Sequence, residues 1–270
     1  MGVLAISFSA ILVRQSGAHP FTAAFYRCAY AVPVLFVLRA RAPATRDRRA
    51  RLIGLLAGVF LAADLLAWHE AIQRIGAGFS TVLGNTQVLF VLAFALLAGA
   101  AVERRALIGV PIALAGVVLI RGIGSDHPLD STGVLLGFVT GVTYAGFLVL
   151  YDRAIARSAS FVGPLLDVTA TAAAICLAAA VADGASLNPG LAGHLWLGLL
   201  ALSSQVLGWI LIAAGFRHLR AVETSTLLLV QPVLTVIWGM LLFDERVAIL
   251  QGVGVAITLV GVAVTRARSA

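Results

Sequence analysis

The amino-acid sequence predicts an all-α polytopic membrane protein with ten transmembrane helices, arranged as two inverted-topology repeats of five. Three observations predict this fold: the composition, a series of apolar runs, and a repeat at a fixed offset. Of the 270 residues, 61% are hydrophobic and only 11% are charged. Soluble domains contain about 45–50% apolar and about 25% charged residues. A single soluble domain is therefore excluded.

Ten apolar runs follow one another along the chain, separated by short breaks that carry arginine, Gly/Pro or Asp/Ser. A transmembrane helix needs about 20 apolar residues, so a chain of this length holds about ten of them. Because the breaks are short, successive helices are expected to be antiparallel neighbours. The runs cover residues 2–13, 20–39, 52–70, 77–98, 106–120, 132–151, 161–182, 195–216, 222–243 and 247–265.

An internal repeat divides these runs into two groups of five. Ser80–Leu83 (Ser-Thr-Val-Leu) recurs 145 residues later as Ser225–Leu228 (Ser-Thr-Leu-Leu), and Gly109–Gly116 matches Gly254–Gly261 at the same offset. Because five is odd, the second half must enter the membrane from the opposite side. The predicted boundaries are 1–121 for the first repeat, 132–265 for the second, and 266–270 for a cytoplasmic tail.

The first apolar run is shorter than the others. Its 12 residues span about 18 Å at 1.5 Å per residue, against a hydrocarbon core of about 30 Å. The matching helix of the second repeat has about ten additional residues, 131–140, before the aligned part begins. We therefore expect the native protein to start about ten residues upstream of Met1.

The net charge of +7 comes from 19 basic residues, all of them arginine, against 12 acidic ones. In a soluble protein this balance would favour nucleic-acid binding. Here the arginines lie between apolar runs, so they report topology through the positive-inside rule. Fourteen fall on one side of the predicted membrane and four on the other, which predicts a bacterial-type inner (plasma) membrane protein with both termini in the cytoplasm and no nucleic-acid partner. The larger group is Arg39, Arg41, Arg46, Arg48, Arg49, Arg51, Arg104, Arg105, Arg153, Arg157, Arg217, Arg220, Arg266 and Arg268; the smaller is Arg14, Arg74, Arg121 and Arg246.

Each half contains a polar site within an apolar helix, then a Glu-Arg pair and a Gly-rich last helix. The motifs are residues 64–72 (DLLAWHEAI), 85–90 (NTQVLF), 231–234 (QPVL) and 244–246 (DER). Over essentially the whole chain the sequence resembles the EamA-type drug/metabolite transporters. The resemblance implies ten helices around a central cavity, with helices 5 and 10 at the back, and export or uptake of small metabolites, often amino acids. The family usually has proline where this chain has Gln87, so a kink in that helix is in question.

Asp64 is the leading candidate site residue, because a charge inside the bilayer costs several kcal/mol and usually faces a cavity or a partner. It would bind a substrate amine or carry a coupling proton; the alternative is a structural pair with Arg27. Trp68 shares its helical face at i+4 and would contact a cationic or stacked substrate, or anchor the helix at the membrane interface. His69, a further predicted cavity residue, and Glu70 follow at the end of this helix, without the second histidine of a zinc motif.

Further intramembrane polar residues complete the prediction. Arg27 and Asp167 occupy matching positions in the two repeats and would serve as gating or structural charges. Pro232 would kink its helix, since proline removes an N–H and frees a carbonyl one turn earlier. Polar and aromatic groups of this kind either line a cavity or join helices. The remaining predicted cavity residues are Asn85, Tyr144, Gln205, Trp209 and Gln231.

The sequence thus predicts a secondary transporter, and specifically an exporter of small polar metabolites such as amino acids. Inverted repeats build such transporters, with the substrate site near the midplane. Export of amphipathic drugs, or a role as a channel or scaffold, are the alternatives. No P-loop occurs, no G-x-S-x-G nucleophile motif occurs, and no cofactor or metal is expected, so an enzyme is not predicted. The expected partners are a small-molecule substrate, the lipid bilayer and a coupling proton.

Overall fold

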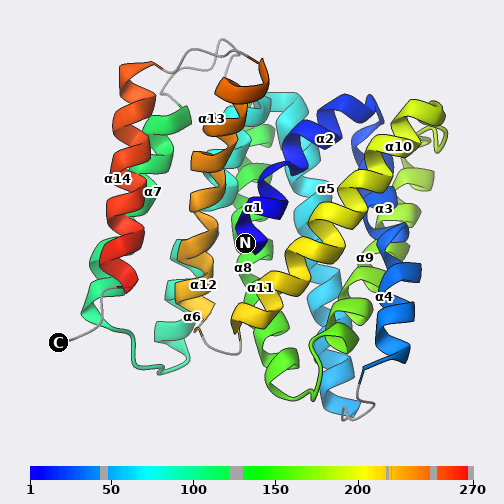
Figure 1. Ribbon diagram of the computed structural model, residues 1–270, viewed down its shortest axis with the longest axis horizontal. Helices are drawn as coiled ribbons and strands as arrows, with labels where there is room; N and C mark the ends of the chain where they lie inside the picture. Colours follow the sequence, from blue (N-terminus) through cyan, green and yellow to red (C-terminus); the bar gives the residue numbers. More distant parts are fainter. Residues whose placement is uncertain (43–47, 122–129, 217–218, 220, 244–247, 267–270) are drawn as a thin grey trace. The chain divides into compact units, whose positions relative to one another are not determined.

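The computed structural model is helical almost throughout the residues that it describes, which are 1–42, 48–121, 130–216, 219, 221–243 and 248–266. No β-strand occurs among them, and Figure 1 shows the helices in chain order. The segments are α1 (Gly2–Ser7), α2 (Ser9–Ser16), α3 (Pro20–Ala29), α4 (Ala31–Ala40), α5 (Arg48–Asn85), α6 (Gln87–Leu97), α7 (Arg104–Arg121), α8 (Ser131–Ala156), α9 (Val162–Ala182), α10 (Gly190–Leu200), the π-helix η1 (Ala201–Gly208), α11 (Trp209–Phe216), α12 (Ala221–Leu228), α13 (Val230–Phe243) and α14 (Ile249–Arg266).

The predicted all-α membrane fold is confirmed. Among the described residues, five helical stretches of 21 to 28 residues are long and apolar enough to cross a membrane, and four shorter apolar ones accompany them. Several predicted spans consist of two or three consecutive segments, such as α3 with α4, or α10 with η1 and α11. The long stretches are Pro20–Ala40, Arg48–Ile75, Ser131–Ala156, Val162–Ala182 and Gly190–Phe216.

One predicted boundary is wrong. The sequence predicts a break between residues 70 and 77, but α5 continues as one helix of 38 residues from Arg48 to Asn85. The segment contains Gly76 and Gly78 and no proline. A glycine inside a helix costs about 1 kcal/mol relative to alanine but keeps its N–H, so the hydrogen-bond ladder continues. The other predicted runs agree with the helices to within a few residues.

The chain forms two compact units, and each combines helices from both sequence repeats. Unit 1 comprises residues 1–69 and 146–218, and unit 2 comprises residues 70–145 and 219–270. Helices α5 and α8 contribute one part to each unit. In Figure 1, α10, η1 and α11 of unit 1 form one continuous oblique rod.

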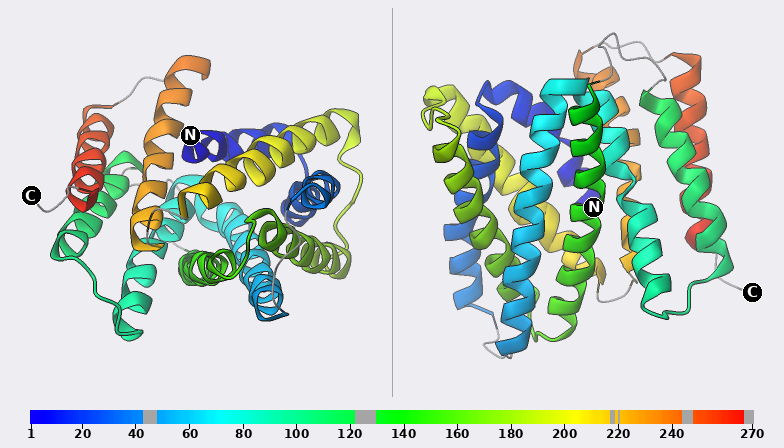
Figure 2. Two further views of the ribbon diagram at one scale, coloured as in Figure 1. Left: turned by 60° about the horizontal axis from the view of Figure 1, so that its bottom comes forward. Right: turned by 180° about the vertical axis from the view of Figure 1, so that it is seen from behind.

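Glycines allow the helices of unit 2 to pack at close range. α7 and α14 lie side by side (Figure 2). A Cβ atom at Gly109 or Gly116 would lie under 3.0 Å from atoms of α14, and one at Gly254 or Gly261 under 3.0 Å from atoms of α7. The two segments that match at the 145-residue offset therefore pack against each other.

Unit 1 is closed at one end by contacts between α3 and the α9–α10 loop. The Thr22 hydroxyl donates to the Ser186 carbonyl, and the Tyr26 hydroxyl donates to the Leu187 carbonyl, both at 2.9 Å. His19 lies 3.5 Å from the Asp183 carboxylate. Gly58 brings α5 close to α9, because a Cβ atom there would lie 2.6 Å from the Val168 carbonyl oxygen.

Candidate functional site

A buried chain of hydrogen bonds in unit 1 joins α3, η1 and α9 through Gln205. The Nε atom of Arg27, on α3, donates to Oε1 of Gln205 at 3.1 Å, and Nε2 of Gln205 donates to Oγ1 of Thr169, on α9, at 3.1 Å. Arg27 is 7% exposed, whereas Gln205 and Thr169 are fully buried. The predicted intramembrane residues Arg27 and Gln205 are therefore in direct contact.

The π-helix η1 carries Gln205 into this position. π-Helical segments within α-helices are rare and frequently occur at functional sites. The neighbouring Ser204 is also fully buried and accepts a hydrogen bond from the Ser9 hydroxyl of α2 at 2.8 Å. Two successive side chains of η1 therefore bind two different helices, which fixes the direction of the Gln205 amide.

Asp64 lies in the apolar interior of unit 1, on α5, and is 8% exposed. Among the described residues no basic group lies within 4.0 Å of its carboxylate, and none donates a hydrogen bond to it. Arg27, Asp64 and His69 are all buried in unit 1, and the direct Asp64–Arg27 ion pair that the sequence leaves open is not formed among the described residues.

His69 and Trp68 lie one turn beyond Asp64. Nδ1 of His69 lies 2.6 Å from the Leu65 carbonyl oxygen; since a carbonyl only accepts, Nδ1 carries the proton. Within the described part of the chain, the buried Nε2 atom has no hydrogen-bond partner. The Trp68 ring is half-buried and packs edge-on against His69, with ring centroids 5.1 Å apart.

Asp167, the repeat counterpart of Arg27, is 7% exposed on α9. It lies over Gly54 of α5, where a Cβ atom would be 3.5 Å from the Asp167 Oδ2 atom. Gly54 is six residues from the start of α5 and ten residues before Asp64. Asp167 therefore contacts α5 near its first turns, about 15 Å along the helix from Asp64 at 1.5 Å per residue.

Trp209 belongs to a buried aromatic cluster. It packs edge-on against Phe147 with ring centroids 4.8 Å apart, and Tyr151 lies 6.1 Å from both Trp209 and Phe216. Trp209 is 2% exposed, so it contributes chiefly to the packing of α8 against α11. Like many buried aromatic groups, these rings adopt edge-to-face arrangements, which are worth about 0.5–1.5 kcal/mol beyond burial.

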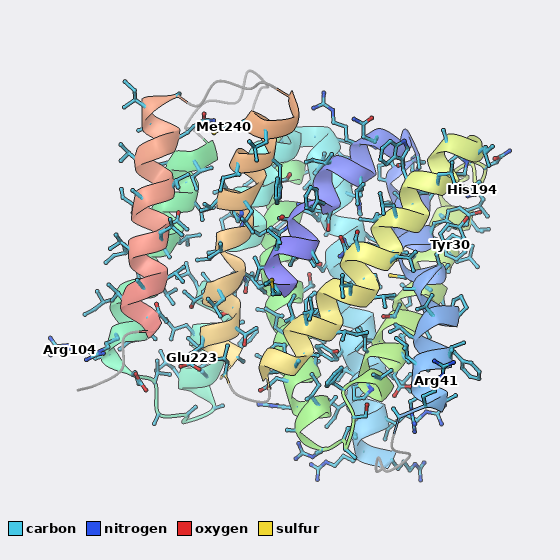
Figure 3. The ribbon with its side chains drawn as sticks, viewed as in Figure 1. Tyr30, Arg41, Arg104, His194, Glu223 and Met240 are labelled. Atoms are coloured by element: carbon cyan, nitrogen blue, oxygen red, sulfur yellow. The ribbon has the colours of Figure 1, made fainter. Side chains whose placement is uncertain are left out.

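Tyr30 and Tyr151, both in unit 1, differ in whether the side-chain hydroxyl has a hydrogen-bond partner. The Tyr30 hydroxyl lies 2.7 Å from Nδ1 of His194, and Figure 3 shows both side chains on the same flank of the unit. The Tyr151 hydroxyl is buried and has no partner among the described residues. We expect Tyr30→Phe to lower the free energy of unfolding by about 1 kcal/mol, and Tyr151→Phe to leave it unchanged or raise it by about 1 kcal/mol, because an unpaired buried hydroxyl is costly.

Thermal unfolding of the purified protein in detergent would measure both effects. Each variant removes one oxygen atom from one tyrosine, so each serves as the control for the other. An equal loss of stability in the two variants would contradict the assignment.

The other predicted cavity residues belong to unit 2. Asn85, at the end of α5, Tyr144, on α8, and Gln231, on α13, are all half-buried. Tyr144 follows Gly141 by one turn, and a Cβ atom at Gly141 would lie 3.1 Å from the Leu83 carbonyl oxygen.

Both repeats interrupt their fourth helix, although only the second has a proline there. Pro232 is buried and has no N–H to bond the Leu228 carbonyl; α12 ends at Leu228, and the Leu229 N–H bonds the Thr226 carbonyl instead. In the first repeat the Thr86 hydroxyl bonds the Leu83 carbonyl, and Thr86 separates α5 from α6. The break between α5 and α6 therefore occurs without proline.

Sequence reasoning missed several buried polar residues. Gln87, which replaces the expected proline, is fully buried and donates through Nε2 to the Ser225 carbonyl at 3.3 Å, joining α6 to α12. Thr169, Ser9 and Ser204 also escaped notice, because small hydroxyl residues are common in membrane helices and carry no spacing signal. The 244–246 motif lies outside the described residues, as do residues 267–270 of the predicted tail.

The sequence of the chain matches the profile of the EamA-like transporter family twice, over residues 1–122 and 131–267. The chain belongs to this family. Both matches follow the two sequence repeats and together span nearly the whole chain. The protein is therefore a multi-pass membrane protein of a transporter family, and no enzyme is among the relatives reported below.

Individual relatives are distant. An uncharacterized transporter of Archaeoglobus fulgidus is 24% identical over 269 residues, which cover 97% of this chain and 94% of the relative. The uncharacterized inner membrane transporter YedA of Escherichia coli is 24% identical over 170 residues, covering 62% of this chain and 54% of YedA. One solved crystal structure superposes on 98% of this chain and 93% of its own, with a TM-score of 0.82 and 17% identity; it supports the fold alone.

Proposed function

We propose that the chain is a secondary transporter that exports small polar metabolites, such as amino acids, across the inner membrane by alternating access. One observation carries this proposal. Two opposite charges, Arg27 and Asp64, are buried in one helical unit of a member of a transporter family without forming a direct ion pair. Buried charges of this kind are costly and mark substrate or ion pathways.

The chemistry around these charges favours a polar substrate over an amphipathic drug. Polar side chains from α2, α3, α5, α9 and η1 gather in unit 1, whereas the large aromatic rings of Trp209, Tyr151 and Phe147 pack against one another. A drug site would instead present aromatic rings to its ligand. In this proposal Asp64 binds the substrate amine or carries a coupling proton.

Alternating access follows from the repeat organisation. Inverted repeats place a substrate site at their interface, and rocking of one repeat against the other exposes it to each side in turn. Trp68 and Gln205 complete the proposed wall in unit 1, and both termini lie in the cytoplasm in the proposed topology. Export is the direction that we propose.

Reconstitution into proteoliposomes tests the proposal. The protein should show saturable counterflow, in which unlabelled substrate inside the vesicles drives uptake of labelled substrate. A metabolite screen of cells with and without the protein, comparing the cell interior with the medium, would supply the substrates. Flux that rises linearly with concentration would indicate a channel, and counterflow of lipophilic cations alone would indicate a drug exporter; either result would overturn the proposal.

A further inference from the structure

The two terminal nitrogens of the Arg27 guanidinium have no hydrogen-bond partner among the described residues. A guanidinium carries five N–H donors and no acceptor, and only the Nε donor of Arg27 is used, by Gln205. Among the described residues, no acceptor bonds the two terminal nitrogens, and no carboxylate lies within 4.0 Å of them. A cation that is 7% exposed and lacks an anionic partner carries a desolvation cost of several kcal/mol, which an anion beside these nitrogens would offset.

The Nε side of the Arg27 guanidinium is held in place by its hydrogen bond to Gln205. Since arginine only donates, the Gln205 side chain must present Oε1 to it, which leaves Nε2 for the Thr169 hydroxyl, as observed. Gln205 and Thr169 are fully buried, so a rotation of the Gln205 amide would place its NH₂ group against the guanidinium. The contact orients Arg27 before any ligand binds, and such preorganisation reduces the entropic cost of binding.

Asp64 completes the pair of charges. Its carboxylate has no hydrogen-bond donor in the described part of the chain, and it is buried in the same unit as Arg27. Unit 1 therefore holds one buried cation and one buried carboxylate, each with atoms that no described residue bonds. A ligand that carries both charges would satisfy both groups at once, because guanidinium–carboxylate contacts are bidentate and charge-assisted.

We propose that Arg27 binds the carboxylate of the transported substrate, so that the protein selects zwitterions over amines and over carboxylic acids. This inference rests on the proposed transport function and assigns its selectivity. Arg27 is then a substrate-binding residue, and Gln205 and Thr169 are positioning residues that act through it. The competing role, a structural pair between Arg27 and Asp64 alone, makes a different prediction in the following experiment.

Four matched probes separate the two charges: L-leucine, leucinamide, 3-methylbutylamine and 4-methylpentanoate, with the corresponding phenylalanine and threonine series for other side-chain sizes. Each is tested for inhibition of counterflow in proteoliposomes and for stabilisation of the detergent-purified full chain against heat. In the wild-type protein we expect an amino acid to bind on the order of 100-fold more tightly than the three probes that lack one charge, as for a lost buried charge pair.

The Arg27 variants test the assignment directly. Arg27→Gln should weaken amino-acid binding to the level of the amine and leave amine binding nearly unchanged, and Arg27→Lys should recover part of the loss. Arg39→Gln, which removes a cation near the end of α4, is the matched control and should behave as the wild type. If Arg27→Gln fails to fold, the relative affinities of the four probes for the wild type and for Arg27→Lys still test whether Arg27 binds the substrate carboxylate.

Three results would overturn the proposal while leaving transport intact. One is equal weakening of zwitterion and amine binding in Arg27→Gln. Another is recovery of amino-acid binding in the double variant Arg27→Gln/Asp64→Asn, which would establish a structural pair. Saturable counterflow of a substrate without a carboxylate would also contradict the role of Arg27 but support the transporter. Absence of counterflow for every metabolite would instead refute the proposed function itself.

Discussion

Replacing Asp64 by asparagine is expected to reduce metabolite transport by on the order of 100-fold, while the protein remains folded. The substitution keeps the shape of the side chain and removes its negative charge. Since neither carboxylate oxygen of Asp64 is hydrogen-bonded by a described residue, no bond between helices is lost with the charge. A substrate ammonium, in contrast, would lose its charge-assisted partner, a change that costs about 2–5 kcal/mol in buried pairs.

The two roles proposed for Asp64 predict different transport activities for the Asp64→Asn variant. If Asp64 binds the substrate amine, both counterflow and net transport disappear in Asp64→Asn. If Asp64 carries only a coupling proton, counterflow persists, because exchange of substrate for substrate needs no net movement of protons. Uptake driven by an imposed pH gradient would then be lost. Measuring both activities in the same proteoliposomes separates the roles.

Asp183→Asn is a suitable control for Asp64→Asn. Asp183 is an exposed carboxylate of unit 1, paired with His19 at 3.5 Å, so its substitution removes a charge from the surface alone. Size-exclusion profiles and unfolding temperatures of both variants should match the wild type. Full transport by Asp64→Asn at every pH would contradict any substrate or proton role of this residue.

Much of the fold could be predicted because membrane helices have strong composition and length requirements. Apolar runs indicated the positions of the helices, and the matching Gly109–Gly116 and Gly254–Gly261 segments indicated the repeat. The division of α5 failed, since residues 71–79 contain glycine and polar groups that resemble a loop but retain every N–H. Breaks inside spans, as at Thr86, were harder to foresee because they depend on a single hydroxyl–carbonyl bond.

The candidate site could be predicted in part. Charged residues in apolar runs are conspicuous, so Arg27, Asp64 and Asp167 were found directly. Which of them make contact could not be predicted, because contacts between α3, α9 and η1 depend on helix rotation and on the π-helical segment. The two hydrogen bonds of the Arg27–Gln205–Thr169 chain join residues that are 178 and 36 positions apart in the sequence, and no spacing rule relates them.

A second large effect is expected at Gly261, where α14 approaches α7. Adding one methyl group there, in Gly261→Ala, should lower the free energy of unfolding by about 3 kcal/mol, as for other overpacked sites. The added Cβ atom would lie under 3.0 Å from the amide nitrogen and Cα atom of Ala113. Because these are backbone atoms, no side-chain rotation makes room, and the two helices must separate.

Gly252→Ala is the matched control on the same helix. A Cβ atom at Gly252 meets no atom within 4 Å, so alanine there should stabilise the helix by about 0.5–1 kcal/mol through its higher helix propensity. Thermal unfolding in detergent would compare the two variants. Ala113→Gly should not rescue Gly261→Ala, since it leaves the backbone atoms in place; full rescue, or equal stability of the two alanine variants, would show that the α7–α14 contact is looser than the structure indicates.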